Sequence, residues 1–224
     1  MVPALALTLA LAQQSIPVAG RIVVGNPAAV ELTNNASQAV TAWSFVVVSP
    51  NAQGGMHREV HTADVYLSEV TRDLPRAQQH LDWVQPGRSV RVPIDAAPAN
   101  ASVEIVAVVF ADRTAAGDPK TIQTFFDHRR AERDQLRDVS ETLNGVLKTE
   151  HGVAALRALE QRLASVPASD DNLPLRSARE AVTTYLAQAG GPQGDRSADE
   201  QIRQYAAFVA KQYALAAAHA NRKP

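Results

Sequence analysis

The spacing of hydrophobic residues along the chain changes near Asp118. Before this residue, hydrophobic positions alternate with polar ones or form short runs that end at Gly, Pro or Asn, which is typical of β-strands. After it, hydrophobic residues recur at every third and fourth position with charged residues between them, which is typical of amphipathic helices. The sequence therefore predicts an α+β protein, with a β-sandwich at residues 18–118 and a helical region at residues 119–222.

Val40–Val48 is the clearest predicted strand. Trp43 and its alternate neighbours point to one face, and the residues between them are also mostly apolar, so we expect both faces to be covered. Val103–Phe110 has the same character and should be a central strand, whereas Pro93 should lie on an edge strand. Further short strands are expected at residues 21–24, 30–32 and 90–94. No crossover helix fits between the strands, which favours an antiparallel sandwich.

Three segments carry a resemblance to a known type of domain. Val40–Val48, the turn Pro86–Ser89 and the run Val106–Asp112 resemble immunoglobulin-like (Ig-like) sandwiches of exported, uncharacterised bacterial proteins. The resemblance covers roughly residues 20–118. It implies an Ig-like fold and an extracytoplasmic setting, and it implies neither an activity nor any site residue. The chain has no cysteine, so the disulfide of antibody domains is absent.

About four helices are predicted in the second half of the chain. Asp118 as N-cap and Pro119 at the first helical position begin a long helix that reaches about Thr149, with Gly152 as its stop. Such a helix extends roughly 45 Å. The others are expected at residues 153–166, at 174–190, and behind a capping box at Ser197–Glu200. Short connections favour helical hairpins or a bundle.

The long helix carries two features that we interpret separately. Phe125 and Phe126 lie just past the junction, and we expect them to dock the helix on the sandwich. The following section, residues 127–137, is almost wholly charged, and we expect it to be exposed on most sides. Its arginines alternate with acidic residues, which favours ion pairs within the helix. These arginines are Arg129, Arg130 and Arg133.

Residues 1–12 have the character of a signal-peptide leader. They are apolar apart from Thr8, and Ala10-Leu11-Ala12 has the small-x-small form of a cleavage site. The segment is too short for a transmembrane helix, which needs about 20 apolar residues. No Lys or Arg precedes the apolar run, which is atypical of a leader. We expect a periplasmic or secreted protein with no transmembrane span in the mature chain.

Composition excludes several functions. The formal net charge of −1 gives no electrostatic reason to expect nucleic acid or an anionic membrane as a partner. The absence of cysteine excludes thiol catalysis, dithiol redox chemistry and cysteine-ligated metal sites. We find no nucleophile elbow and no glycine-rich phosphate loop in the sequence. We therefore assign no catalytic and no cofactor-binding residue, and expect no cofactor.

His57, Glu59 and His61 form a candidate metal site. On a strand, these alternate residues project from one face, and two imidazoles with a carboxylate can bind zinc. Their spacing differs from the helical HExxH motif. A solvent-facing polar strand is the simpler interpretation, and we assign no metal ligand.

Asp112, Thr114 and Asp118 surround Gly117 and offer oxygen ligands for calcium. Their spacing does not match an EF-hand loop, and a turn followed by a helix cap explains them better. Trp43 should be a core residue, while Trp83 is either a core residue or an exposed binding anchor.

Three functions are compatible with these observations. The preferred one is a non-enzymatic extracytoplasmic protein-interaction module, an adaptor or scaffold with a protein partner. The alternative is a self-associating structural or assembly component of the cell envelope. A metal-dependent hydrolase using His57, Glu59 and His61 is the third.

Overall fold

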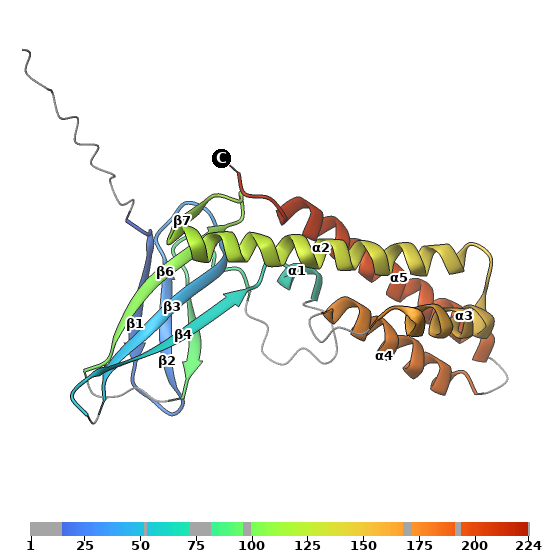
Figure 1. Ribbon diagram of the computed structural model, residues 1–224, viewed down its shortest axis with the longest axis horizontal. Helices are drawn as coiled ribbons and strands as arrows, with labels where there is room; N and C mark the ends of the chain where they lie inside the picture. The colour runs from blue at the N-terminus through green and yellow to red at the C-terminus, as the bar shows by residue number, and fades with distance from the viewer. Residues whose placement is uncertain are drawn as a thin grey trace, which may run out of the picture.

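The computed structural model describes residues 15–51, 53–71, 82–95, 100–167, 172–190 and 194–223. The leader predicted at residues 1–12 lies outside the described residues. The protein is α+β, as predicted: its N-terminal part forms two antiparallel sheets and its C-terminal part forms helices (Figure 1).

All pairings between the described strands are antiparallel. The smaller sheet has the order β1 (Val18–Val23), β2 (Ala28–Asn34) and β5 (Ser89–Ile94). The larger sheet has the order β4 (Met56–Asp64), β3 (Val40–Pro50), β6 (Ser102–Phe110) and β7 (Ala115–Gly117). β5 is an edge strand, which confirms the prediction for Pro93.

The two sheets share one hydrophobic core. β2 contributes Val30 and Leu32 to it, and β3 contributes Trp43 and Phe45. Trp43 is only 1% exposed, which confirms it as a core residue. The buried side chains occupy alternate positions of each strand. The alternating hydrophobic residues of the sequence therefore form the buried faces of the two sheets.

The first turns of helix α2 (Pro119–Leu147) pack on the opposite face of the larger sheet. A second hydrophobic cluster joins the helix to the sheet, and its buried members are Ala42, Ala107, Val109, Ile122, Phe125 and Phe126. The predicted docking by Phe125 and Phe126 is confirmed. Both faces of β3 are therefore buried, as its apolar sequence indicated.

The helices extend away from the sheets (Figure 1). A short helix, α1 (Ser68–Thr71), follows β4, and α2 is followed by α3 (Gly152–Ser165), α4 (Leu173–Gln188) and α5 (Gly194–His219). α5 packs beside α2 and returns to the sheets, where the Lys223 amide donates to the Arg113 carbonyl (3.1 Å). Leucines dominate the buried core between the helices; among them are Leu136, Leu143, Leu156, Leu159 and Leu163.

The helix boundaries confirm one prediction and correct two. Asp118 caps α2, since its carboxylate accepts a hydrogen bond from the Thr121 amide (2.8 Å). Gly152 does not stop α2, which ends at Leu147, but begins α3 with φ of 54°. The positive φ favours glycine, and a Cβ there would lie 2.0 Å from an Asp195 carboxylate oxygen, so any other residue would have to displace this side chain of α5.

The capping box predicted at Ser197–Glu200 is also wrong, because α5 begins at Gly194 and both residues lie inside the helix. Asp195 in the first turn of α5 accepts a hydrogen bond from the Val153 amide (2.8 Å), and Asp199 accepts one from the Gly152 amide (3.2 Å). The carboxylates of α5 therefore satisfy the free amides at the start of α3.

Weakening the hydrophobic cluster between α2 and the larger sheet should allow the two parts of the protein to unfold separately. Phe126→Ala should cost about 3–5 kcal/mol, because it removes a fully buried ring between α2 and the sheet. Both tryptophans, Trp43 and Trp83, belong to the N-terminal part. Urea unfolding followed by tryptophan fluorescence and by helical circular dichroism should then give two separate midpoints. Leu173→Ala, at an exposed position, is the control; coincident and unshifted midpoints for Phe126→Ala would contradict the prediction.

Candidate functional site

The structure does not bring His57, Glu59 and His61 together as a metal site. All three lie on β4, where His57 is exposed and the His61 ring stacks on Phe45 with 4.9 Å between ring centroids. The His61 Nε2 atom lies 3.0 Å from a Glu59 carboxylate oxygen. Within the described ranges, no three His, Asp or Glu side chains are grouped closely enough to hold a metal ion. The geometry gives the zinc hypothesis no support.

The carboxylates near Gly117 have structural roles. Asp112 accepts hydrogen bonds from the Thr114 amide (3.0 Å) and hydroxyl (2.7 Å), which closes the turn between β6 and β7. Hydrogen bonds from the Thr121 side chain and backbone lower the pKa of Asp118. The contacts of Asp112, Thr114 and Asp118 are therefore those of a turn and a helix cap, which is the interpretation that the sequence favours over a calcium site.

Arg129 is an exception to the expectation that residues 127–137 are exposed on most sides and that their arginines pair within the helix. It is 0% exposed, and its guanidinium donates two hydrogen bonds to Asp64 of β4 (2.8 and 2.7 Å) and one to the Thr41 hydroxyl (3.1 Å). Its ion pair is thus with the sheet and not within the helix. Arg130 does pair with Asp127 one turn away, as predicted.

The spacing of residues in the sequence contains a signal that Arg129 is buried. Ile122, Phe126 and Arg129 follow one another at four and three residues, so they lie on one face of α2. That face continues the apolar stripe that docks on the sheet. A charged residue in such a stripe is buried only if it finds a partner, and Asp64 supplies one.

Tyr66 extends the contact around Arg129. The guanidinium lies over the Tyr66 ring, 4.7 Å from its centroid, and the Tyr66 hydroxyl donates to a Glu132 carboxylate oxygen (2.6 Å). Burial raises the pKa of Tyr66 and of Glu132. We call Thr41, Asp64, Tyr66, Arg129 and Glu132 the junction cluster. It binds the sheet, the segment after β4 and α2 to one another.

The end of α5 packs against the junction cluster. His219 is 7% exposed, and its ring centroid lies 5.9 Å from that of Tyr66 and 5.7 Å from that of Trp83. Its buried Nδ1 atom has no hydrogen-bond partner among the residues that the structure describes. Burial, together with the charges of Arg129 and Arg113, lowers the pKa of His219 to about 4. Trp83 donates its indole N–H to the Val65 carbonyl (3.0 Å), so it acts as a half-buried packing residue.

A groove on the helical region is the strongest candidate for a binding site. It has a volume of about 950 Å³ and is formed by one side of α5, with α1 and α4 at its edges. Its lining residues are Glu69 and Val70 of α1, Tyr185 of α4, and Gln204, Tyr205, Ala207, Phe208, Lys211, Ala214, Leu215 and Ala218 of α5. We call this surface the α5 groove.

The α5 groove is mainly apolar and has two parts. Aromatic rings meet at one part: the Tyr205 centroid lies 6.5 Å from that of Tyr185 and 6.3 Å from that of Phe208. Alanines of α5 form much of the remainder. The groove is not among the features predicted from the sequence, although α5 carries a signal for it: an apolar face made of Ala207, Ala214 and Ala218.

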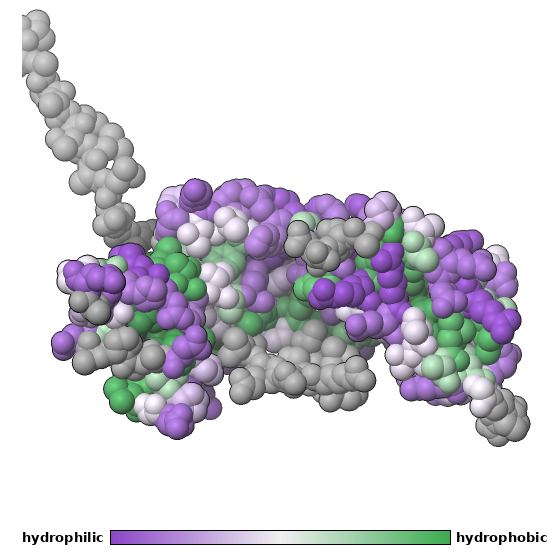
Figure 2. Space-filling view, turned by 60° about the horizontal axis from the view of Figure 1, so that its bottom comes forward, coloured by the Kyte–Doolittle hydropathy of each residue, from purple (hydrophilic) through white to green (hydrophobic). Residues whose placement is uncertain are grey.

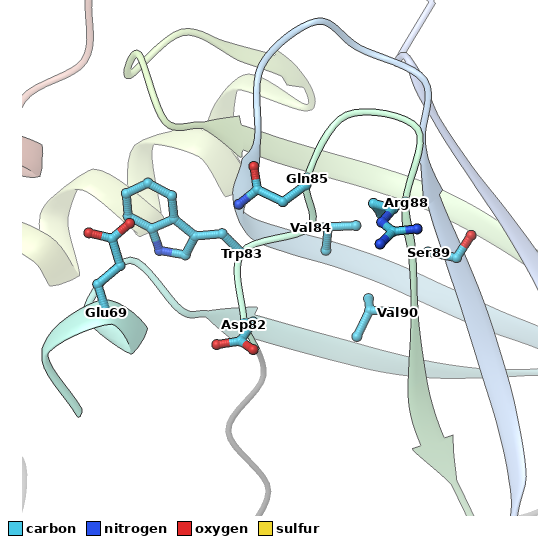
Figure 3. A pocket seen from close by; sticks show the side chains of 8 residues that line it. All are labelled: Glu69, Asp82, Trp83, Val84, Gln85, Arg88, Ser89 and Val90. Carbon is cyan, nitrogen blue, oxygen red and sulfur yellow. The ribbon is translucent and has the colours of Figure 1, made fainter. Parts of the chain in front are cut away.

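A second, more polar pocket lies between α1 and β5 and has a volume of about 400 Å³. Figure 3 shows Glu69 and Trp83 on one side of it, and Arg88, Ser89 and Val90 on the other. Arg88 and Ser89 are exposed to solvent. Because water already solvates these polar groups, this pocket is a weaker candidate than the α5 groove.

Comparisons with protein-family models, with curated proteins and with solved structures found no match to this chain. None of the helices in the described part of the chain combines the length and the apolar character needed to cross a membrane.

His219 predicts a pH dependence of stability. Its pKa in the folded protein, about 4, is below its ordinary value of 6.5, so the unfolded chain binds the proton more readily. The stabilisation from neutral His219 is fully present above pH 6.5 and is lost as the pH falls to about 4. The total is about 3 kcal/mol.

Urea unfolding at several values of pH measures this effect. The stability difference between the wild type and His219→Gln should shrink as the pH falls from 7 toward 4, within the window set by the two pKa values. His128→Gln, at an exposed position of α2, is the matched control. A difference that is constant with pH would show that His219 titrates normally in the folded protein.

Proposed function

We propose that this chain is a non-enzymatic extracytoplasmic protein-interaction module, an adaptor or scaffold, in which the α5 groove receives a partner protein. The observation that carries the proposal is an apolar groove of about 950 Å³ that has aromatic side chains at its edge. Exposed apolar grooves with a few polar groups commonly mark the sites at which proteins bind partners or ligands.

The N-terminal part is proposed to be an Ig-like scaffold. Strands β1, β2 and β5 form one sheet, and β4, β3, β6 and β7 form the other, so the chain passes from one sheet to the other three times. This order corresponds to A-B-E and C′-C-F-G in Ig-like sandwiches. The extracytoplasmic location depends on the leader-like character of residues 1–12 and on the resemblance of the strands to exported proteins.

The junction cluster supports a scaffold role. It attaches α2 firmly to β4 through the pair of Arg129 and Asp64, and the remaining helices pack on α2. The groove is therefore held at a defined place relative to the sheets. An adaptor that presents a partner in one orientation requires such a connection between its parts.

One observation favours the alternative, a self-associating component of the envelope. β4 lies at the edge of its sheet within the described chain, spans nine residues, and leaves Met56 and Val60 60% and 66% exposed. Free edge strands can pair with a second chain. Arg58 and Glu59 on the same strand oppose this pairing, as charges on edge strands commonly do. Figure 2 shows hydrophobic side chains at both the sheet end and the helical end of the molecule.

Photo-crosslinking tests the proposed function. A photoreactive amino acid at Ala214, in the groove, should give a covalent adduct with a different protein in intact cells of the source organism. The matched control is the same amino acid at Ala154, an exposed alanine on α3 outside the groove. The adduct should form from position 214 and not from position 154. An adduct with the chain itself would favour the structural component, and no adduct from position 214 would contradict docking in the groove.

A further inference from the structure

We infer that the α5 groove binds an amphipathic helix that presents an acidic side chain to Lys211. This inference rests on the proposed function and names the class of partner. The groove follows α5 from Gln204 to Ala218, and its α5 residues recur every three or four positions. At 1.5 Å per residue this face is about 21 Å long, which is the length of a helix of four turns. A helix laid along it makes contacts at positions i, i+3, i+4 and i+7.

The shape of the groove favours a helix with large apolar side chains. Ala207, Ala214 and Ala218 are exposed and contribute little volume, so they leave room between the edges of the groove. Small residues on one helix permit close approach of another, whose larger side chains fill the space. The rings of Tyr205 and Phe208 are only partly buried and offer aromatic contact at one part of the groove.

The charges of the groove define the polar part of the partner. Lys211 is exposed among the apolar residues, and the ion pairs found in the described part of the chain do not include it. Glu69 of α1 supplies the groove with one acidic group. A partner carboxylate opposite Lys211 therefore finds a cation within an apolar surface, where an ion pair is screened less than at an open surface.

The same lysine argues against a second copy of this chain as the occupant. Lys211 is the middle residue of the stretch 204–218, because seven residues lie on each side of it. A two-fold symmetric contact between two copies of α5, centred on the groove, would bring each Lys211 next to the lysine of the other copy. Like charges at such a contact are unfavourable. Charge complementarity thus favours a different protein with an acidic helix.

Two synthetic peptides test this inference on the full chain. Both are 18-residue amphipathic helices with leucines on one face, and they differ in one central residue, Glu in the first and Lys in the second. Fluorescence anisotropy should show that the wild type binds the Glu peptide about 3- to 10-fold more tightly. Lys211→Glu should reverse this preference, while Lys148→Glu, an exposed lysine outside the groove, should leave it unchanged. Ala214→Arg should abolish binding of both peptides.

The outcomes separate this inference from the proposed function. Equal binding of both peptides, or no effect of Lys211→Glu, would overturn the acidic-helix inference. If neither peptide binds but Ala214 still crosslinks to a foreign protein, the function stands and the partner is not such a helix. A dimer in sedimentation that Ala214→Arg dissociates would identify a second copy as the occupant. Binding to phosphatidylcholine vesicles that Ala214→Arg removes would identify a lipid surface; either result overturns the inference. Circular dichroism of each variant confirms that it is folded.

Discussion

The arrangement of this protein depends on one buried ion pair. The Arg129 guanidinium is completely buried; Asp64 accepts two of its hydrogen bonds and Thr41 accepts a third. A guanidinium in this geometry tolerates little rotation or sliding, since both bonds to the carboxylate depend on its orientation. The pair therefore fixes the position of α2 on the sheet. Phe125 and Phe126 supply the hydrophobic contact, which is large but less specific in direction.

The position of the candidate site follows from this attachment. α2 continues past the sheets, where α3, α4 and α5 pack on it, and α5 then returns so that His219 contacts Tyr66 and Trp83. Both ends of the helical region are thus held: one through α2 and the other through the last turn of α5. The groove uses the side of α5 that this packing leaves uncovered, with α1 beside it. The junction cluster contains residues of the sheet and of the helical region, so it connects the sheets to the helices that form the groove.

Features that depend on neighbouring residues could be predicted from the sequence. The change of period at Asp118, the N-cap, the core position of Trp43 and the docking by Phe126 all follow from local patterns. Features that depend on distant contacts could not. Arg129 lies in a charged stretch that resembles a solvated helix, and its partner precedes it by 65 residues. The role of Gly152 at the start of α3 could not be read from the sequence either, because the carboxylates that accept from the first amides of α3, Asp195 and Asp199, belong to α5. The alanines of the groove could not be recognised in the sequence as a binding surface, because their exposure depends on how the helices pack.

A double-mutant cycle on Asp64 and Arg129 tests the central claim most directly. Because Arg129 is 0% exposed and the Asp64 side chain is 20% exposed, the two deletions are not equivalent. Asp64→Asn leaves a buried cation without its counter-charge and should cost about 3–5 kcal/mol. Arg129→Met leaves a carboxylate that reaches water and should cost clearly less, and the double variant should resemble Arg129→Met alone. Equal and additive losses measured by urea unfolding would contradict the view that this pair fixes α2 on the sheet.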